Sequence, residues 1–313
     1  MYKRFKKMKT QWARSQRKQL FIGIFGTLLI ILAVLSFVIY FQKKHTQQID
    51  HKLPLTVTNL EYCHKEKLDL FVPQSNRPVP LVVYIHGGGW RYGSKVGGTL
   101  DMFTPLLEDG IAVASINYRL ADSKKFPAAP QDILCAVRFL KSQANVYNIN
   151  PDQIGLAGIS AGAHLAALSA NGASEKTFAA KEYEAFSSDV QAVVLINGIY
   201  DLDYKKITKT TEENIAHFLP DDSPSTRAFA SPIRTVSGTS PAQLVIYSAN
   251  DTLVHSDQSL QYVQKAKRVG ADVQAVEVNN ADHNLKILWG TVPSPSRNET
   301  KRIIRTFFND KLR

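Results

Sequence analysis

The stretch QIGLAGISAGAHLAAL, residues Gln153–Leu168, joins a short apolar run to an alanine-rich segment through the pentapeptide Gly158-Ile159-Ser160-Ala161-Gly162. The apolar run predicts a buried strand, and the alanine-rich segment predicts a helix. Between a strand and a helix, the two glycines permit a sharp bend that larger side chains would block, so the Ser160 hydroxyl would stand at the head of the helix. Because such a pentapeptide also occurs by chance, Ser160 is a candidate nucleophile only if the rest of the chain supplies its partners.

Further apolar runs alternate with helical patterns along the chain. Segments 55–62 and 68–72 alternate as half-exposed strands do and predict a hairpin. Unbroken apolar runs predict buried strands at 81–85, 110–118, 190–196 and 242–247, a last strand is expected at 273–278, and helices are expected at 102–108, 130–143, 257–269 and 301–308. This order predicts an α/β fold whose central sheet is mostly parallel, with helices on both faces.

Charge is concentrated at the start of the chain. The 313 residues carry a formal net charge of +11, but residues 1–44 hold ten Lys or Arg and no acid. This leaves 28 of the 38 bases against all 27 acids in residues 45–313. A nearly neutral folded part gives no support for nucleic acid as a partner.

A membrane anchor is predicted near the N-terminus. Residues 20–41 are 22 residues without a charge, enough to span a bilayer as a helix. Eight bases precede the span and only Lys43 and Lys44 directly follow it, so the basic head, residues 1–19, is expected in the cytoplasm. Residues 42–54 would form a stalk, and residues 55–313 an extracytoplasmic domain of a single-pass cell-membrane protein. A cleaved signal peptide remains an alternative, although this core is long and no A-x-A-like site follows it.

The chain has two cysteines, Cys63 in an early strand and Cys135 on the apolar face of a helix. An outward-facing domain would allow a disulfide between them. The expectation from the sequence is nevertheless two buried free thiols.

A nucleophilic serine needs a histidine as base and a carboxylate that orients the histidine. Asp251 directly follows the strand expected at 242–247, and His283 follows the strand expected at 273–278, which gives the order Ser, Asp, His. Asp282 is the alternative acid, but it adjoins His283 and would point elsewhere. Four other histidines are weaker candidates for the base. His86 belongs to a glycine loop, His164 lies on the helix one turn past Ser160, and His217 and His255 are not placed after a strand.

The glycine loop His86-Gly87-Gly88-Gly89-Trp90 directly follows a predicted buried strand. Because glycines have no side chain, the backbone of this loop could approach a substrate closely. The N–H groups of Gly88, Gly89 and Ala161 would then stabilise an oxyanion. Trp90 and Ile159 adjoin these groups and are candidate substrate contacts. No metal-ligand spacing such as H-E-x-x-H occurs in the sequence.

From about residue 55 onward the chain resembles the α/β hydrolases, specifically the carboxylesterase branch related to hormone-sensitive lipase and to bacterial acetyl and feruloyl esterases. The matching motifs follow the family order: HGGGW at 86–90, NYRL at 117–120, FPAAPQD at 126–132, GISAG at 158–162, Asn250-Asp251 and Asp282-His283. The resemblance implies hydrolysis of short-chain acyl esters without a cofactor. Ile159 and Ala163 look more like the acetyl and feruloyl esterase branch, and little space precedes the first strand for a cap domain.

Together these patterns predict a membrane-anchored serine carboxylesterase that acts on a small-molecule or glycan-linked acyl ester. Tyr118, Arg119 and Asp132 are expected to brace loops. Segments 171–188 and 203–240 are candidate lids. Two alternatives stay open, an amidase or peptidase with the same three residues and an inactive hydrolase fold used for binding.

Overall fold

The computed structural model describes residues 54–179 and 181–313. The predicted basic head, the membrane span and nearly all of the stalk lie outside these residues. Within the described part, no helix has the length and apolar character that crossing a bilayer requires.

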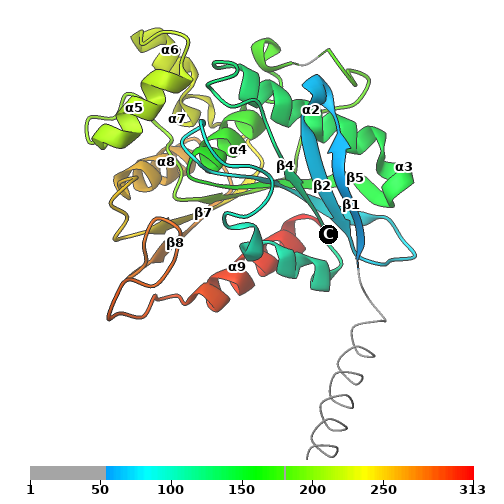
Figure 1. Cartoon of the computed structure of the whole chain (residues 1–313). Helices are drawn as coiled ribbons and strands as arrows, with labels where there is room; N and C mark the ends of the chain where they lie inside the picture. The colour runs from blue at the N-terminus through cyan, green and yellow to red at the C-terminus, as the bar shows by residue number, and fades with distance from the viewer. Residues whose placement is uncertain (1–53, 180) are drawn as a thin grey trace, which may run out of the picture. The chain divides into compact units, whose positions relative to one another are not determined.

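One sheet organises the described chain (Figure 1). Its eight strands, in spatial order, are β1 (Leu55–Glu61), β2 (Lys67–Val72), β4 (Ala112–Ile116), β3 (Val79–Ile85), β5 (Ile149–Ile159), β6 (Ala192–Ile196), β7 (Ala242–Ser248) and β8 (Val273–Val278). The β1–β2 and β2–β4 pairs are antiparallel and all other neighbours are parallel, so β2 alone runs against the rest. The predicted N-terminal hairpin and mostly parallel sheet are confirmed.

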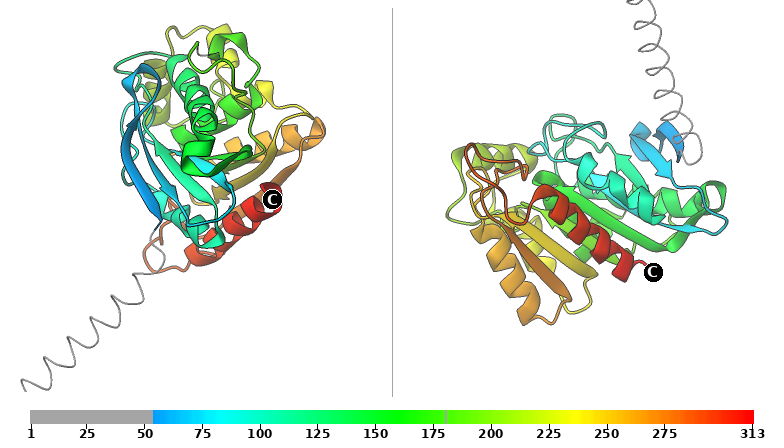
Figure 2. Two further views of the ribbon diagram at one scale, coloured as in Figure 1. Left: turned by 90° about the vertical axis from the view of Figure 1, so that its right-hand side faces the viewer. Right: turned by 90° about the horizontal axis from the view of Figure 1, so that it is seen from below.

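Helices cover both faces of this sheet. The described helices are α2 (Ala128–Ser142), α3 (Ala144–Tyr147), α4 (Ala161–Asn171), α5 (Lys209–Phe218), α6 (Pro224–Phe229), α7 (Pro232–Thr235), α8 (Asp257–Arg268) and α9 (Arg297–Lys311), with short 3₁₀ turns η1 (Cys63–Lys65), η2 (Leu100–Met102), η3 (Thr104–Asp109) and η4 (Lys176–Phe178). The segment expected as a helix at 102–108 is therefore made of 3₁₀ turns. Figure 2 shows α9 lying across one face of the sheet.

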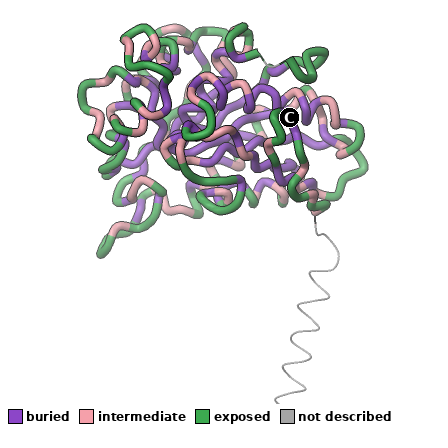
Figure 3. The backbone as a smooth tube through the Cα atoms, turned by 45° about the horizontal axis from the view of Figure 1, so that its top comes forward, coloured by how far each residue is buried: buried purple, intermediate pink, exposed green. Residues whose placement is uncertain are grey.

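The two faces explain why the central strands are apolar without interruption. In β3, Leu81, Val83 and Ile85 join the cluster that includes residues of α2, α4 and α8. Val82 and Tyr84 point the other way and join the cluster formed with η3 and α9. Figure 3 shows the buried segments gathered in the middle of the domain. A strand covered on both sides cannot alternate between apolar and polar residues.

The cysteine prediction was wrong, because Cys63 and Cys135 form a disulfide. Cys63 lies in η1, in the connection between β1 and β2, and Cys135 lies on α2. The bridge joins residues 72 positions apart and ties the antiparallel edge of the sheet to a covering helix. The sequence placed each thiol in an apolar setting, but it did not show that the η1 turn brings the two together.

Candidate active site

Ser160 lies at the bend between β5 and α4 in an unusual backbone conformation, with φ 57° and ψ −124°. The surrounding chain holds this bend, since the Ser160 N–H donates to the Ile196 carbonyl at 2.8 Å and its own carbonyl accepts from the His164 N–H at 3.0 Å. A Cβ at Gly162 would collide with the carbonyl oxygen of Ile85, so the bend requires glycine there. Such strain at a strand-to-helix turn is typical of an exposed nucleophile.

Asp251 and His283 come together at the same edge of the sheet. Asp251 follows β7, and its Oδ2 accepts a hydrogen bond from His283 Nδ1 at 2.6 Å. The other carboxylate oxygen accepts from the backbone N–H groups of Leu253 and Val254 at 2.8 and 2.9 Å, which fixes the carboxylate in place. Parallel strands end at one edge, so the loops after β5, β7 and β8 meet there.

The second ring nitrogen of His283 is free to act as a base. Nε2 is buried and makes no hydrogen bond to any described residue. In the tautomer whose Nδ1 donates to Asp251, the lone pair of Nε2 is available to accept a proton. His283 and Ser160 line the same cavity, whose volume is about 630 Å³.

Asn197 is a supporting residue that the sequence analysis missed. It follows β6 with φ 46°, its Nδ2 donates to the His283 carbonyl at 2.7 Å, and its Oδ1 accepts from the Ser248 N–H at 2.7 Å. It therefore ties the loop that carries His283 to the end of β7. Its position directly after a buried strand was the signal that could have identified it.

The alternative residues have other roles. The Asp282 carboxylate accepts from the backbone N–H groups of Asn284 and Lys286 at 2.8 Å and stabilises their turn. His164 is fully buried, where its Nδ1 accepts from Trp90 Nε1 at 3.0 Å and its Nε2 contacts the Ala230 carbonyl at 2.8 Å. Burial lowers the pKa of His164 to about 4.

His86 starts the glycine loop, and its ring is held by other contacts. Its Nδ1 donates to the Gly87 carbonyl at 2.7 Å, its ring stacks on Tyr118 at 4.4 Å between centroids, and burial lowers its pKa. The Tyr118 hydroxyl donates to the His86 carbonyl at 3.1 Å, and Arg119 pairs with Asp132 at 2.7 Å. Tyr118, Arg119 and Asp132 brace loops, as the sequence predicts.

The glycine loop offers unpaired N–H groups beside Ser160. Gly88 and Gly89 have φ values of 116° and 59°, and a Cβ at Gly88 would collide with the carbonyl of Tyr92. Within the described chain, the N–H groups of Gly88, Gly89 and Ala161 donate to no other protein atom. Three free donors near a strained serine suit a developing negative charge on an oxygen.

The two candidate substrate contacts differ in their surroundings. Ile159 lines the cavity next to Ser160. Trp90 also belongs to the cavity wall, but its side chain is only 1% exposed and stacks on Phe218 of α5 at 4.9 Å between centroids. The Trp90 ring therefore packs between the glycine loop and α5 and stabilises their positions.

Of the two candidate lids, segment 203–240 contributes to the cavity. Among the described residues, none from 171–188 lines it. The part of the wall that comes from α5 is polar, whereas the rest of the wall mixes apolar residues with polar ones such as Arg91 and Ser94. The α5 residues are Thr210, Thr211, Glu213 and Asn214, and the apolar residues include Ile159, Ile199, Leu253 and Val254.

Comparisons with known proteins find relatives that are named hydrolases. Esterase LipC of Mycobacterium tuberculosis is 27% identical over 240 residues, which cover 74% of this chain and 59% of that protein. Kynurenine formamidase of Danio rerio is 32% identical over 228 residues, 70% of each chain. The chain spans between half and three fifths of the length of the mycobacterial relatives that it matches.

A solved structure supports the fold independently. A truncated carbohydrate esterase from gut microbiota superposes with a TM-score of 0.73 at 24% identity, covering 84% of this chain and 98% of that one. A family model, BD-FAE, matches residues 68–266. The predicted resemblance to the esterase branch is thereby confirmed, and the chain belongs to the BD-FAE family of α/β-hydrolase esterases.

Proposed function

We propose that this protein is a membrane-anchored serine carboxylesterase that hydrolyses short-chain acyl esters of small molecules or glycans. The observation that carries the proposal is the 2.6 Å contact between Asp251 and His283 in a chain whose His283 Nε2 is free and shares a cavity with Ser160. The family's named esterases support the reaction type. The apolar part of the cavity, which includes Ile159 and Ile199, suits a short acyl chain.

The reaction would proceed through an acyl-enzyme. Ser160 Oγ attacks the ester carbonyl while His283 Nε2 takes its proton, and Asp251 stabilises the imidazolium that forms. The carbonyl oxygen, now negative, accepts hydrogen bonds from the N–H groups of Gly88, Gly89 and Ala161. When the carbon–oxygen bond breaks, His283 returns the proton to the departing alcohol, and water then releases the acid by the same steps.

The membrane placement rests on the uncharged segment 20–41 with its basic head. A disulfide between Cys63 and Cys135 supports an extracytoplasmic catalytic domain, because disulfides persist in oxidising compartments.

The test is ester hydrolysis by the full-length chain in detergent. Wild type should hydrolyse p-nitrophenyl acetate, and Ser160→Ala should lose at least about a thousandfold in kcat, because the oxyanion donors alone retain only a small part of the rate enhancement. The exposed Ser187→Ala variant should behave as wild type. Equal turnover by wild type and Ser160→Ala would refute the proposal.

The amide alternative keeps the same residues and is favoured by one observation, the 32% identity to a kynurenine formamidase. A panel of aryl formamides and acetamides beside the matching esters decides between them, since faster amide cleavage would favour this alternative. An inactive binding protein would fail to react with a fluorophosphonate probe at Ser160.

A further inference from the structure

Asn214 stands out on the polar wall of the cavity. Its side chain lies against the glycine loop: a Cβ placed on Gly89 would be only 2.6 Å from Asn214 Nδ2 and 2.9 Å from Cγ. Asn214 is half-buried, and its side chain makes no hydrogen bond to any described residue. A carboxamide with a donor and an acceptor unused, beside the loop that would bind the reacting carbonyl, is free to bind substrate.

Helix α5 holds this side chain in a fixed place. At its start, the hydroxyls of Thr208 and Thr211 both donate to the Leu253 carbonyl at 3.1 Å. At its end, Phe218 stacks on Trp90. The two ends of α5 are therefore attached to the Asp251 loop and to the glycine loop, respectively.

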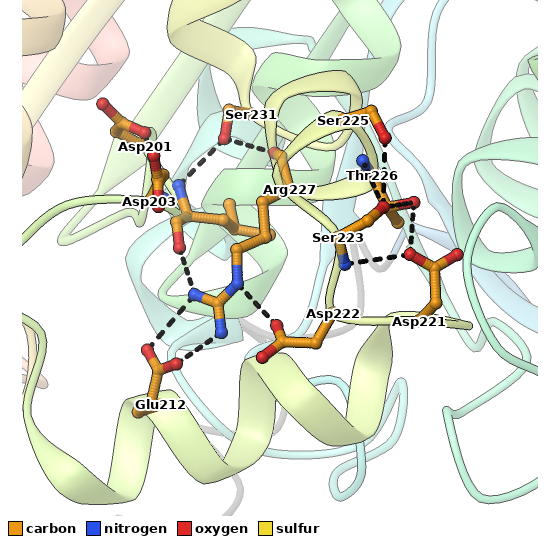
Figure 4. A network of polar contacts seen from close by, with 11 residues as sticks. Asp201, Asp203, Glu212, Asp221, Asp222, Ser223, Ser225, Thr226, Arg227 and Ser231 are labelled. Carbon is orange, nitrogen blue, oxygen red and sulfur yellow. Dashed lines mark hydrogen bonds and ion pairs between the residues drawn. The ribbon is translucent and has the colours of Figure 1, made fainter.

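Arg227 of α6 holds the first turn of α5 through Glu212. Figure 4 shows its guanidinium between the carboxylates of Glu212 and Asp222. Nη1 also donates to the Leu202 carbonyl at 2.7 Å, and the Arg227 side chain is only 9% exposed. Glu212 precedes Asn214 by two residues on the same helix. A side chain on a helix held at three places can select a substrate by geometry.

The polar wall from α5 and the apolar patch that includes Ile159 and Ile199 suit the two halves of an ester. An acyl chain has no groups that could use the hydroxyls, carboxylate and carboxamide of α5, whereas an alcohol with further hydroxyls does. A hydroxyl both donates and accepts, so it can satisfy the Asn214 carboxamide on both sides. A site that hydrogen-bonds a substrate hydroxyl also rejects analogues without it, because its own polar groups stay unpaired.

We propose that Asn214 is a specificity residue that binds a hydroxyl adjacent to the ester oxygen on the alcohol half of the substrate. The substrate class is then an ester of a polyol or a sugar with a neighbouring free hydroxyl. This inference rests on the proposed esterase function, and it adds the recognised group and the residue that recognises it.

The test compares two esters that differ in a single hydroxyl, the monoacetate of trans-1,2-cyclohexanediol and cyclohexyl acetate. With the full-length protein in detergent, wild type should prefer the diol monoacetate by about tenfold in kcat/KM, as one well-placed hydrogen bond allows. Asn214→Leu keeps the side-chain size but cannot hydrogen-bond, and it should lose this preference. Asn145→Leu makes the same change at an exposed position on α3, outside the cavity, and should keep it.

The outcomes separate this inference from the function on which it rests. If wild type hydrolyses neither cyclohexyl ester nor p-nitrophenyl acetate, the esterase proposal fails. If it hydrolyses both cyclohexyl esters with equal kcat/KM, or if Asn214→Leu keeps the wild-type preference, the assignment of Asn214 is overturned while the esterase stands. Asn214→Ala, which introduces no bulk, is the second variant in case leucine disturbs folding. Parallel loss on both esters in both variants would also overturn the assignment.

Discussion

The buried histidine His164 should make the stability of the domain depend on pH. His164 accepts a hydrogen bond from Trp90 at Nδ1, so protonation of that nitrogen would break the bond and bury a charge. Its pKa is about 4 in the folded protein, lowered by burial, against about 6.5 in an unfolded chain. Between these values the unfolded state binds a proton that the native state does not, so the free energy of unfolding falls as the pH falls below 6.5.

We therefore expect urea unfolding at pH 7.5, 6.5 and 5.5 to show a loss that approaches about 1.4 kcal/mol per pH unit from this residue. His164→Gln cannot ionise and should show a shallower loss, whatever its stability at pH 7.5. Some slope should remain, because burial lowers the pKa of His86 in the same direction. Identical slopes in the two proteins would contradict the expected charge state of His164.

At the scale of residues, the sequence predicted the candidate catalytic residues better than the residues that hold them in place. Ser160, Asp251 and His283 each follow a predicted strand of a mostly parallel sheet, and parallel strands end at one edge, so the predicted strand order brings the three together. Asn197 and Asn214 were missed because their roles depend on contacts across the fold, with the His283 carbonyl and with the glycine loop. Trp90 adjoins the active loop in sequence, but its ring is buried under α5.

At the scale of elements, long apolar segments predicted the strands reliably, whereas the ends of the elements were predicted less reliably. The central strands match their predicted segments closely because each is covered on both faces. The last helix begins at Arg297, four residues before its expected start, because Ser296 and Glu299 form a capping box outside the apolar repeat. The disulfide escaped prediction because spacing says nothing of how η1 turns Cys63 toward α2.

The position of α5 should depend on Arg227. The Glu212 carboxylate raises the pKa of Arg227, and the guanidinium also donates hydrogen bonds to the Asp222 carboxylate and the Leu202 carbonyl. Both carboxylates are partly exposed, so solvent screens the ion pairs and most of the cost of losing Arg227 comes from unpaired polar groups. We expect Arg227→Met to lower the free energy of unfolding by about 1–3 kcal/mol.

The same variant should lose preference for the diol monoacetate while Ser160 still reacts with a fluorophosphonate probe, because α5 shifts and the strained bend does not. Chemical unfolding and the two-ester comparison measure these effects. Arg234→Met, at an exposed arginine on α7, is the matched control. If Arg227→Met costs no more than this control, α5 is held by its other contacts.

At the scale of the whole molecule, the disulfide and the uncharged segment bear on the same question of location. A bridge closing a segment of 72 residues contributes about 4 kcal/mol in the chain-entropy model, which a reducing cytoplasm would remove. Positive residues retained inside would place the head, residues 1–19, in the cytoplasm and everything after residue 41 outside. The argument from the disulfide and the argument from the basic head depend on different residues. Because both predict that the domain lies outside the cytoplasm, a measurement of its location tests both.

We expect alkaline carbonate to leave the full-length protein in the membrane, because an uncharged segment of 22 residues that spans the bilayer would not be released when electrostatic contacts are weakened. Protease added to intact cells stripped of their wall should digest the catalytic domain, and a maleimide should label Cys63 and Cys135 only after reduction and unfolding. The mass of the mature N-terminus separates an anchor from a cleaved signal peptide, which would leave the domain outside but soluble. Protection from protease together with maleimide labelling in the absence of reductant would place the domain in the cytoplasm and refute the proposed topology.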